Sequence, residues 1–225
     1  MGEFLRVGGP VVWILLGFSV VALTLILLKL WQFMRLRPES LSDVRLSLRL
    51  WKTGEAERAL TVLCLARPVS SVVHGAMQGV LAHPPWATVS LADRVLKEEL
   101  ERLAQEKLRA MRAYLRPLEV IATLSPLLGL LGTVLGMIGA FQQMERAGSQ
   151  VDPSVLSGGI WQALLTTAVG LAVAIPVVAT HSWLERKAER VADQMNDAVT
   201  RVFTQGVSAP EKSKAPERTV RPHAA

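Results

Sequence analysis

Residues 120–144 read VIATLSPLLGLLGTVLGMIGAFQQM and residues 153–184 read PSVLSGGIWQALLTTAVGLAVAIPVVATHSWL; neither stretch carries a charged side chain at neutral pH. A third uncharged run, VVWILLGFSVVALTLILL, occupies residues 11–28. A run of about 18 apolar residues is enough to predict a membrane-spanning helix. We therefore predict an all-α integral membrane protein with three transmembrane helices. The pattern argues against a soluble globule, a secreted disulfide scaffold and a disordered chain.

The composition agrees with this class of protein. The chain has 225 residues, of which 50% are hydrophobic and 20% are charged, whereas soluble domains contain about 25% charged residues. Lysine and arginine number 25 against 19 acidic residues, a formal net charge of +6. The basic surplus flanks the three runs instead of forming a compact patch, so it favours a topology signal over nucleic-acid binding. The single cysteine, Cys64, allows no internal disulfide.

The first run is interpreted as an uncleaved membrane anchor. Its 18 residues exceed the hydrophobic core of a signal peptide, which is about 7–15 residues long. No small-residue cleavage site follows it, and Lys29, Arg35 and Arg37 come next. Lys29, at the inner end, is expected to extend its ammonium group toward the membrane surface.

Basic residues are distributed unequally between the two sides of the predicted spans. Cytoplasmic flanks of membrane helices carry an excess of lysine and arginine. Arg6 and Arg146 are the basic residues on one side, and those nearest the spans on the other side are Lys29, Arg35, Arg37, Arg109, Arg112, Arg116, Arg186, Lys187 and Arg190. This asymmetry predicts a periplasmic N-terminus and a cytoplasmic C-terminus.

The order of these segments predicts how the chain is organised. The segments are an N-terminal periplasmic end with transmembrane helix 1 (1–34), a cytoplasmic helical domain (35–116), transmembrane helix 2 (117–144), a periplasmic loop (145–158), transmembrane helix 3 (159–184), a cytoplasmic helical extension (185–205) and a disordered basic tail (206–225).

Apolar spacing predicts helices within the cytoplasmic part. We expect them at 41–54, 55–65 and 69–82, with Gly54 and Pro68 as stop signals for the first two. A longer helix is expected from residue 90 to Pro117, continuing almost without a break into the second span. The third span is likewise expected to continue as a helix toward Phe203. The two spans would then extend as long rods.

Small residues form a stripe along each of the last two spans. In the second span they are spaced by three, four and three residues, and in the third by four, three and four. The stripes consist of Gly129, Gly132, Gly136 and Gly139, and of Ala163, Thr167, Gly170 and Ala174. Small residues let helix backbones approach closely in lipid. We predict that the two spans pack on each other, and that the second stripe also packs a neighbouring subunit or a partner helix.

Polar side chains inside the spans are few. Apart from Thr123 and Ser125 they are Thr133, Gln162, Thr166 and Thr167. A threonine in a membrane helix can simply bond a carbonyl of its own helix, but the Gln162 amide requires partners. Gln162 and Thr166 lie one turn apart and share a face. Pro126 and Pro176 each free a carbonyl and are expected to kink their helices.

No Asp, Glu, Arg or His occupies the central part of a predicted span. Proton paths through membranes ordinarily use an ionisable group, so a conducting complex would require that group from another subunit. The four histidines are scattered, and no metal-ligand spacing, nucleophile motif or phosphate loop is present. We therefore expect no enzymatic activity and no cofactor or metal.

The run from Leu118 to Phe141 resembles the second span of the ExbB/TolQ/MotA proton-channel family, and the run from Gly159 to Pro176 resembles its third span. The specific resemblance covers about residues 110–190. The three-span layout resembles that of ExbB and TolQ, with ExbB the more similar of the two, whereas MotA-type stators have four spans.

The resemblance implies a homopentamer in the bacterial inner membrane. The ring would enclose an ExbD/TolR-like single-span subunit whose pore Asp carries protons down their gradient. Together they would act on a TonB/TolA-like protein, most simply to energise TonB-dependent outer-membrane transport. A TolQ-like role in envelope integrity or division, and a membrane scaffold that conducts nothing, remain as alternatives.

The resemblance also assigns roles to particular residues. Thr133 matches the pore-lining threonine of the family's Gly-Thr-Val segment, and Thr167 matches the threonine of its third span. Both hydroxyls would hydrogen-bond the partner's carboxylate or a relay water, with Thr166 beside them in the pathway. Gln162 departs from the family, where Glu is common, and its amide cannot titrate. That Thr133 and Thr167 are packing residues is the alternative.

Overall fold

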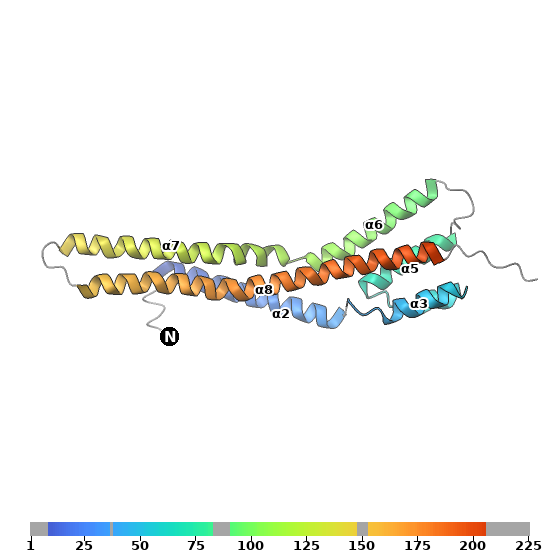
Figure 1. Ribbon diagram of the computed structural model, residues 1–225, viewed down its shortest axis with the longest axis horizontal. Helices are drawn as coiled ribbons and strands as arrows, with labels where there is room; N and C mark the ends of the chain where they lie inside the picture. The colour runs from blue at the N-terminus through green and yellow to red at the C-terminus, as the bar shows by residue number, and fades with distance from the viewer. Residues whose placement is uncertain (1–8, 37, 83–90, 148–152, 206–225) are drawn as a thin grey trace, which may run out of the picture. The chain divides into compact units, whose positions relative to one another are not determined.

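The computed structural model describes residues 9–36, 38–82, 91–147 and 153–205. These residues contain helices and no strand, which confirms the all-α prediction. The helices are α2 (Gly9–Leu36), α3 (Ser42–Lys52), α4 (Ala56–Thr61), α5 (Pro68–Ala82), α6 (Leu91–Arg112), α7 (Leu115–Ala147) and α8 (Pro153–Gln205) (Figure 1). The predicted disordered tail at 206–225 lies outside the described residues.

The chain divides into two compact units. The first, called here the span unit, comprises residues 1–37 and 109–189, and the second unit comprises residues 38–108 and 190–225. The span unit contains α2, α7 and the first part of α8. The second unit contains α3, α4, α5, most of α6 and the end of α8.

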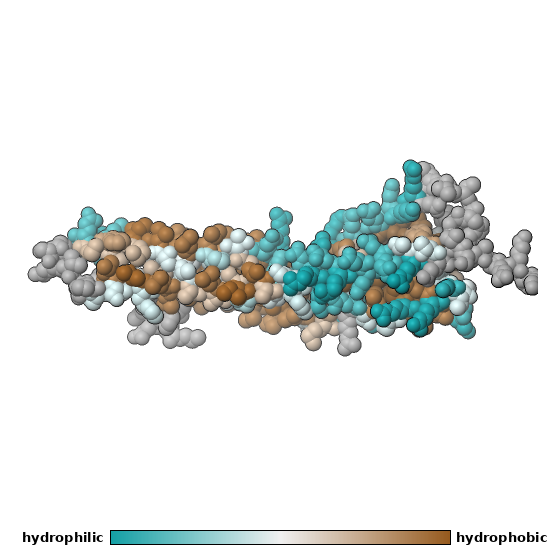
Figure 2. All heavy atoms as spheres, viewed as in Figure 1, coloured by the Kyte–Doolittle hydropathy of each residue, from teal (hydrophilic) through white to brown (hydrophobic). Residues whose placement is uncertain are grey.

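Within the described ranges, three helices are long and apolar enough to cross a membrane. They cover Gly9–Arg35, Leu115–Arg146 and Leu156–Thr204. Their hydrophobic side chains lie largely on the surface, where Leu130 is 58% and Ile175 is 66% exposed. Figure 2 shows hydrophobic side chains gathered over α7 and the first part of α8. So large an apolar surface is unfavourable in water, and this chain is a membrane protein.

Helix α2 presents one buried stripe and packs against α7. The most buried side chains of α2 follow spacings of four, seven and seven residues, namely Val11, Leu15, Ala22 and Lys29. Positions with these spacings fall on one face of an α-helix. The helical phase therefore places Lys29 on the packed face, where its side chain is 2% exposed. The expectation that it reaches the membrane surface is wrong.

The helices of the second unit follow the sequence prediction closely. Helix α3 ends just before Gly54, whose φ of +83° is accessible to glycine. Helix α5 begins at Pro68, a residue tolerated in a first turn because it lacks a backbone N–H. Helix α4 is shorter than expected, since the Leu63 N–H bonds the Leu60 carbonyl at 3.3 Å in a tighter turn.

Buried hydrogen bonds hold the second unit together. The Ser47 hydroxyl of α3 donates to the Ala59 carbonyl of α4 at 2.7 Å. The Trp51 indole Nε1–H donates to the Val202 carbonyl of α8 at 3.2 Å. Both side chains are buried, at 0% and 7% exposure, so each bond satisfies a polar group that water does not reach.

Asp43 on α3 binds the segment between α4 and α5 and the first turn of α5 through hydrogen bonds. Its carboxylate accepts from the Cys64 backbone N–H at 3.1 Å, the Arg67 guanidinium at 2.8 Å and the Ser70 hydroxyl at 2.6 Å. Desolvation on burial opposes ionisation, but the hydrogen bonds from Ser70, Cys64 and Arg67 prevail and lower the pKa of Asp43 below its ordinary value. The carboxylate is thus charged at neutral pH.

The predicted passage from the cytoplasmic helix into the second span is interrupted. Helix α6 ends at Arg112 and α7 begins at Leu115, with Tyr114 at a φ of +65°. Pro117 explains the break: within a continuous helix its ring would clash with the Ala113 carbonyl and it could donate no hydrogen bond there. The break places Pro117 in the first turn of α7. In contrast, α8 continues unbroken, as predicted.

Candidate functional site

Helices α7 and α8 meet along a tightly packed seam. A Cβ atom added at Gly129 would lie 3.0 Å from the Thr167 Cα, and one added at Gly132 would lie 2.5 Å from the Thr166 Oγ1. At Gly136 it would lie 3.0 Å from the Ala163 Cβ. Only the absence of these side chains allows the two backbones to approach so closely.

Small residues of α8 complete the other side of the seam. A Cβ atom at Gly170 would lie 2.6 Å from the Ser125 carbonyl oxygen and 3.0 Å from the Gly129 Cα. Ala163 and Ala174 are buried, at 2% and 3% exposure. Small residues of the second stripe are therefore engaged within the chain, and its packing on a neighbouring subunit or a partner helix stays a prediction.

Gly139 is different from the other glycines of its stripe. No heavy atom lies within 4 Å of a Cβ atom built there. The residue lines an open cavity instead of the seam. The stripe thus packs against α8 along three glycines and leaves the fourth exposed to space.

Three threonine hydroxyls lie at or beside the seam. Those of Thr166 and Thr167 both donate to the Gly129 carbonyl, at 3.3 and 3.0 Å, and Thr166 also donates to the Ala163 carbonyl at 2.7 Å. The Thr133 hydroxyl donates to the Leu130 carbonyl of its own helix at 2.6 Å. Gly129 is therefore a shared acceptor that links two adjacent residues of α8 to α7.

Burial separates these threonines into two kinds. Thr166 is 2% exposed and faces α7, whereas Thr133 and Thr167 are half-buried. A half-buried hydroxyl can gain a further partner from outside the chain, but a buried one cannot without a rearrangement of the seam. Thr133 and Thr167 are therefore the two hydroxyls available to a neighbouring molecule.

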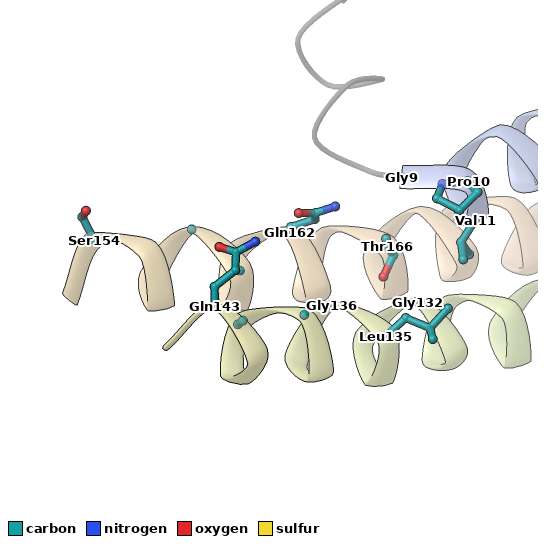
Figure 3. A pocket seen from close by; sticks show the side chains of 14 residues that line it. Gly9, Pro10, Val11, Gly132, Leu135, Gly136, Gln143, Ser154, Gln162 and Thr166 are labelled. Atoms are coloured by element: carbon teal, nitrogen blue, oxygen red, sulfur yellow. The ribbon is translucent and has the colours of Figure 1, made fainter. Parts of the chain in front are cut away.

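A cavity of about 630 Å³ opens beside the seam, toward the Ala147–Pro153 ends of α7 and α8 (Figure 3). It lies between the first turn of α2, the glycine side of α7 and the first turns of α8, and its polar lining comes from Gln143, Ser154, Gln162 and Thr166. Gln162 and Thr166 share this cavity, in agreement with their predicted common face. Gln162 approaches α2, with its Nε2 3.6 Å from a Cβ built at Gly9.

The two prolines stand inside helices that continue through them. Pro126 lies within α7 and Pro176 within α8. Next to Pro126 the Ser125 hydroxyl, 0% exposed, donates to the Ile121 carbonyl at 2.7 Å. One turn after Pro176 the Thr180 hydroxyl donates to the Pro176 carbonyl at 2.8 Å. Neither bond reaches the carbonyl that its proline leaves without a backbone donor, which belongs to Ala122 for Pro126 and to Ala172 for Pro176.

The seam can bind polar groups but cannot itself titrate. Its polar side chains are hydroxyls, and the adjoining cavity adds the amides of Gln143 and Gln162. Across the described ranges, no group of three or more His, Cys, Asp or Glu residues could hold a metal ion. Each threonine O–H is already donated to a backbone carbonyl, so the hydroxyls are left to accept hydrogen bonds, from a visiting protonated carboxyl group or from water.

Sequence patterns did not find every residue of interest in the span unit. Lys29 was identified only as a flanking charge, yet its Nζ donates to the Met111 carbonyl at 3.0 Å and to the Gln32 Oε1 at 2.9 Å. The spacing of Lys29 from Leu15 and Ala22 carried the necessary signal, because all three fall on one helical face.

Comparison with known proteins agrees with the architecture. The family model described as the MotA/TolQ/ExbB proton channel family matches residues 68–197. This match covers α5, α6, α7 and most of α8, and so includes the whole seam.

Individual relatives bear the names of two systems. The chain is 37% identical over 111 residues to biopolymer transport protein exbB1 of Vibrio cholerae, covering 49% of each chain. It is 32% identical to the biopolymer transport protein ExbB-like 3 of Synechocystis sp., covering 75% of this chain and 77% of the relative. It is also 32% identical over 87 residues to Tol-Pal system protein TolQ of Haemophilus influenzae, covering 39% and 38%.

The extent of these matches varies. The chain spans about half of the length of the Vibrio protein and 66% of the ExbB-like 1 protein of Synechocystis sp.. The family match nevertheless covers more than half of this chain and contains the seam built from α7 and α8. The chain belongs to the MotA/TolQ/ExbB proton channel family.

Proposed function

We propose that this chain is an ExbB-like subunit of an inner-membrane motor driven by the proton motive force. The observation that carries the proposal is the chemistry of the α7–α8 seam, which offers hydroxyl groups without an ionisable side chain among its described residues. Such a seam can accept a hydrogen bond from a protonated carboxyl group but cannot replace that group. The titrating group has to come from a second protein.

The second protein is an ExbD/TolR-like subunit with one membrane span and an Asp within it. Protons would bind this carboxylate from one side of the membrane and leave it toward the other. Thr133 and Thr167 would accept a hydrogen bond from this carboxyl group in its protonated form or from a relay water, because their hydroxyls are half-buried and keep free lone pairs. Thr166 and Gln162 would lie behind them, at the seam and in the adjoining cavity.

The assembly would be a homopentamer in the bacterial inner membrane. The stoichiometry is inferred from the resemblance to ExbB and TolQ. The large exposed apolar side chains of α7 and α8, such as Leu130 and Leu164, are compatible with neighbouring copies as well as with lipid. The lysine and arginine asymmetry supports a periplasmic N-terminus and a cytoplasmic C-terminus.

The process energised is proposed to be TonB-dependent outer-membrane transport. Relatives named for biopolymer transport support this choice, and a relative of the Tol-Pal system supports a TolQ-like role in envelope integrity as the second candidate. The partner would distinguish them, since a TonB-like or a TolA-like protein would be bound. A non-conducting scaffold would retain its function when the proton gradient is dissipated.

Gentle purification from native membranes followed by mass spectrometry tests the proposal. The expected result is a small single-span protein with one Asp in its span, recovered with several copies of this chain. A stable ring without such a protein in several mild detergents would contradict the motor and favour the scaffold. A protonophore should abolish the function of the native complex.

A further inference from the structure

Lys29 is a buried cation in the middle of a helix contact. Its side chain is 2% exposed, although α2 is otherwise apolar for most of its length. Burying an ammonium group is unfavourable unless polar atoms replace its water. The polar atoms that contact the Lys29 ammonium group therefore indicate its structural role.

Two of the three contacts of Lys29 are made with the joint between α6 and α7, which comprises residues 109–115, and the third is made within α2. The Nζ donates to the Met111 carbonyl at 3.0 Å and lies 5.8 Å from the centre of the Tyr114 ring. Gln32, one turn further along α2, accepts a second hydrogen bond at 2.9 Å. An ammonium group has three donors, and among the described residues no carboxylate forms an ion pair with it.

Met111 belongs to the last turn of α6. The last four carbonyls of an α-helix have no partner within the helix. Here the Arg109 carbonyl accepts from the Ala113 N–H at 2.8 Å, and the Met111 carbonyl accepts from Lys29. A cation at this position also interacts favourably with the negative end of the helix dipole. Lys29 is thus a C-terminal cap supplied by a different helix.

Tyr114 makes the joint unusual. It is the one non-glycine residue with a positive φ in the described part of the chain, and that conformation is unfavourable for a side chain with a Cβ. Pro117 prevents a continuous helix, but it does not dictate how the chain turns. In the observed conformation the ring of Tyr114 lies beside the Lys29 ammonium group, a contact that favours it.

We propose that Lys29 is a positioning residue that locks the α6–α7 joint by capping the Met111 carbonyl and holding Tyr114 in its left-handed conformation. The joint begins at Arg109, where the chain passes from the second unit into the span unit. A change in α7 can reach α6 along the chain only through these residues. This consequence rests on the proposed motor function, whereas the lock itself does not.

Hydrogen–deuterium exchange of the full chain in nanodiscs tests the lock directly. In Lys29→Met the amides of residues 109–115 should exchange about tenfold faster than in the wild type, because opening of the last turn becomes easier. Arg35→Met is the matched control. Arg35 is also a cation on α2, but it is exposed and stacks on Trp31 of its own helix at 5.2 Å. Wild-type exchange in Lys29→Met would overturn the proposal.

Further variants guard against simple misfolding. Lys29→Arg keeps a charged donor and should exchange at 109–115 within about twofold of the wild type. Pro117→Ala allows the Leu115 N–H to bond the Met111 carbonyl, as in a continuous helix. In that background Lys29→Met should change exchange at 109–115 much less than in the wild type. An equal effect in both backgrounds would show that Lys29 acts elsewhere.

A functional readout separates this inference from the proposed function. In a complementation assay Lys29→Met should lose activity while it still co-purifies with the partner, and Lys29→Arg should restore activity. Full activity of Lys29→Met alongside faster exchange would overturn the coupling role of the joint. If wild-type function did not depend on the proton gradient, the proposed motor function would be refuted. The hydrogen–deuterium exchange result would still test whether Lys29 stabilises the α6–α7 joint.

Discussion

The hydroxyl of Thr167 donates a hydrogen bond to the backbone carbonyl of Gly129 at 3.0 Å, although the two residues belong to different spans and are 38 positions apart. Thr166 reaches the same carbonyl at 3.3 Å. Interhelical hydrogen bonds in membranes contribute about 0.6 kcal/mol on average. The Gly129 carbonyl is thus a common acceptor, and the two threonines differ mainly in how much of each faces outward.

Thr167→Val should abolish the motor function while the complex still assembles. Valine has nearly the shape of threonine, so the seam remains packed, and the lost hydrogen bond costs only about 0.6 kcal/mol. The missing hydroxyl, however, would no longer be available to the partner's carboxylate. Complementation of a strain that lacks the native gene measures function, and co-purification of the partner measures assembly.

Thr166→Val is the matched control for this prediction. It makes the same chemical change one residue earlier, at a side chain that is 2% exposed and faces α7. We expect it to retain function, and Thr167→Ser to retain function as well. Normal complementation by Thr167→Val would refute the proposed role of this hydroxyl and leave Thr167 as a packing residue.

Gly170→Ala should destabilise the span unit. The new Cβ would lie 2.6 Å from the Ser125 carbonyl oxygen and 3.0 Å from the Gly129 Cα, and both are backbone atoms that cannot rotate away. Overpacking of this kind costs about 1–3 kcal/mol. Thermal denaturation of the detergent-purified chain should show a lower midpoint than the wild type.

Gly139→Ala provides the comparison within the same small-residue pattern. No heavy atom lies within 4 Å of its added Cβ, and alanine is a better helix former than glycine by about 1 kcal/mol. The variant should be as stable as the wild type or slightly more stable. Equal destabilisation by the two substitutions would mean that the seam is not packed as described.

The packing of the seam was largely predictable from the sequence. Spacings of three and four residues placed Gly129, Gly132 and Gly136 on one face, and in lipid a face of small residues indicates close helix contact. The spacing did not reveal how many neighbours share that face. That the second stripe, on α8, also packs a neighbouring subunit or a partner helix stays a prediction; within the chain, Gly170 of this stripe already contacts α7.

The conformation of the α6–α7 joint and the burial of Lys29 could not be predicted from the sequence. Met111, Arg112 and Ala113 are good helix formers, and Pro117 alone warned of a break without showing its conformation. Lys29 follows an apolar run, which normally indicates a residue at the membrane surface. Lys29 is buried because it lies on the same helical face as Leu15 and Ala22. The sequence did not show that this face of α2 packs on α7.

Asp43→Ala should destabilise the second unit by about 2 kcal/mol, because the Cys64 N–H and the Arg67 and Ser70 side chains lose their acceptor. The native hydrogen bonds lower the pKa of Asp43. The stabilisation is therefore present above the unfolded pKa of about 3.9 and is lost as pH falls through the lower folded value. Denaturation midpoints at neutral and acidic pH measure this dependence.

Glu99→Gln is the control for Asp43. Glu99 forms an exposed ion pair with Arg102 at 2.7 Å, and exposed pairs contribute little to stability. Its substitution should leave the midpoint nearly unchanged at both pH values. A difference between the wild type and Asp43→Ala that stayed constant as the carboxylate became protonated would show that the charge of Asp43 does not contribute to the stabilisation.

Gln162→Ala should retain function, in contrast to Thr167→Val. The amide of Gln162 cannot exchange a proton at physiological pH. The side chain lines an open cavity of about 630 Å³ beside α2 and lies outside the tight part of the seam. Its loss therefore removes neither a titrating group nor a packing contact between α7 and α8.

Gln162→Glu completes this test, because it introduces a carboxyl group with an ordinary pKa of about 4.3 at the same position. The dependence of function on external pH should then differ from that of the wild type, since a second titrating group would now stand beside the pathway. Complementation at several external pH values measures this. Loss of function in Gln162→Ala as complete as in Thr167→Val would contradict the prediction and assign the amide, through a bound water, to the proton path itself.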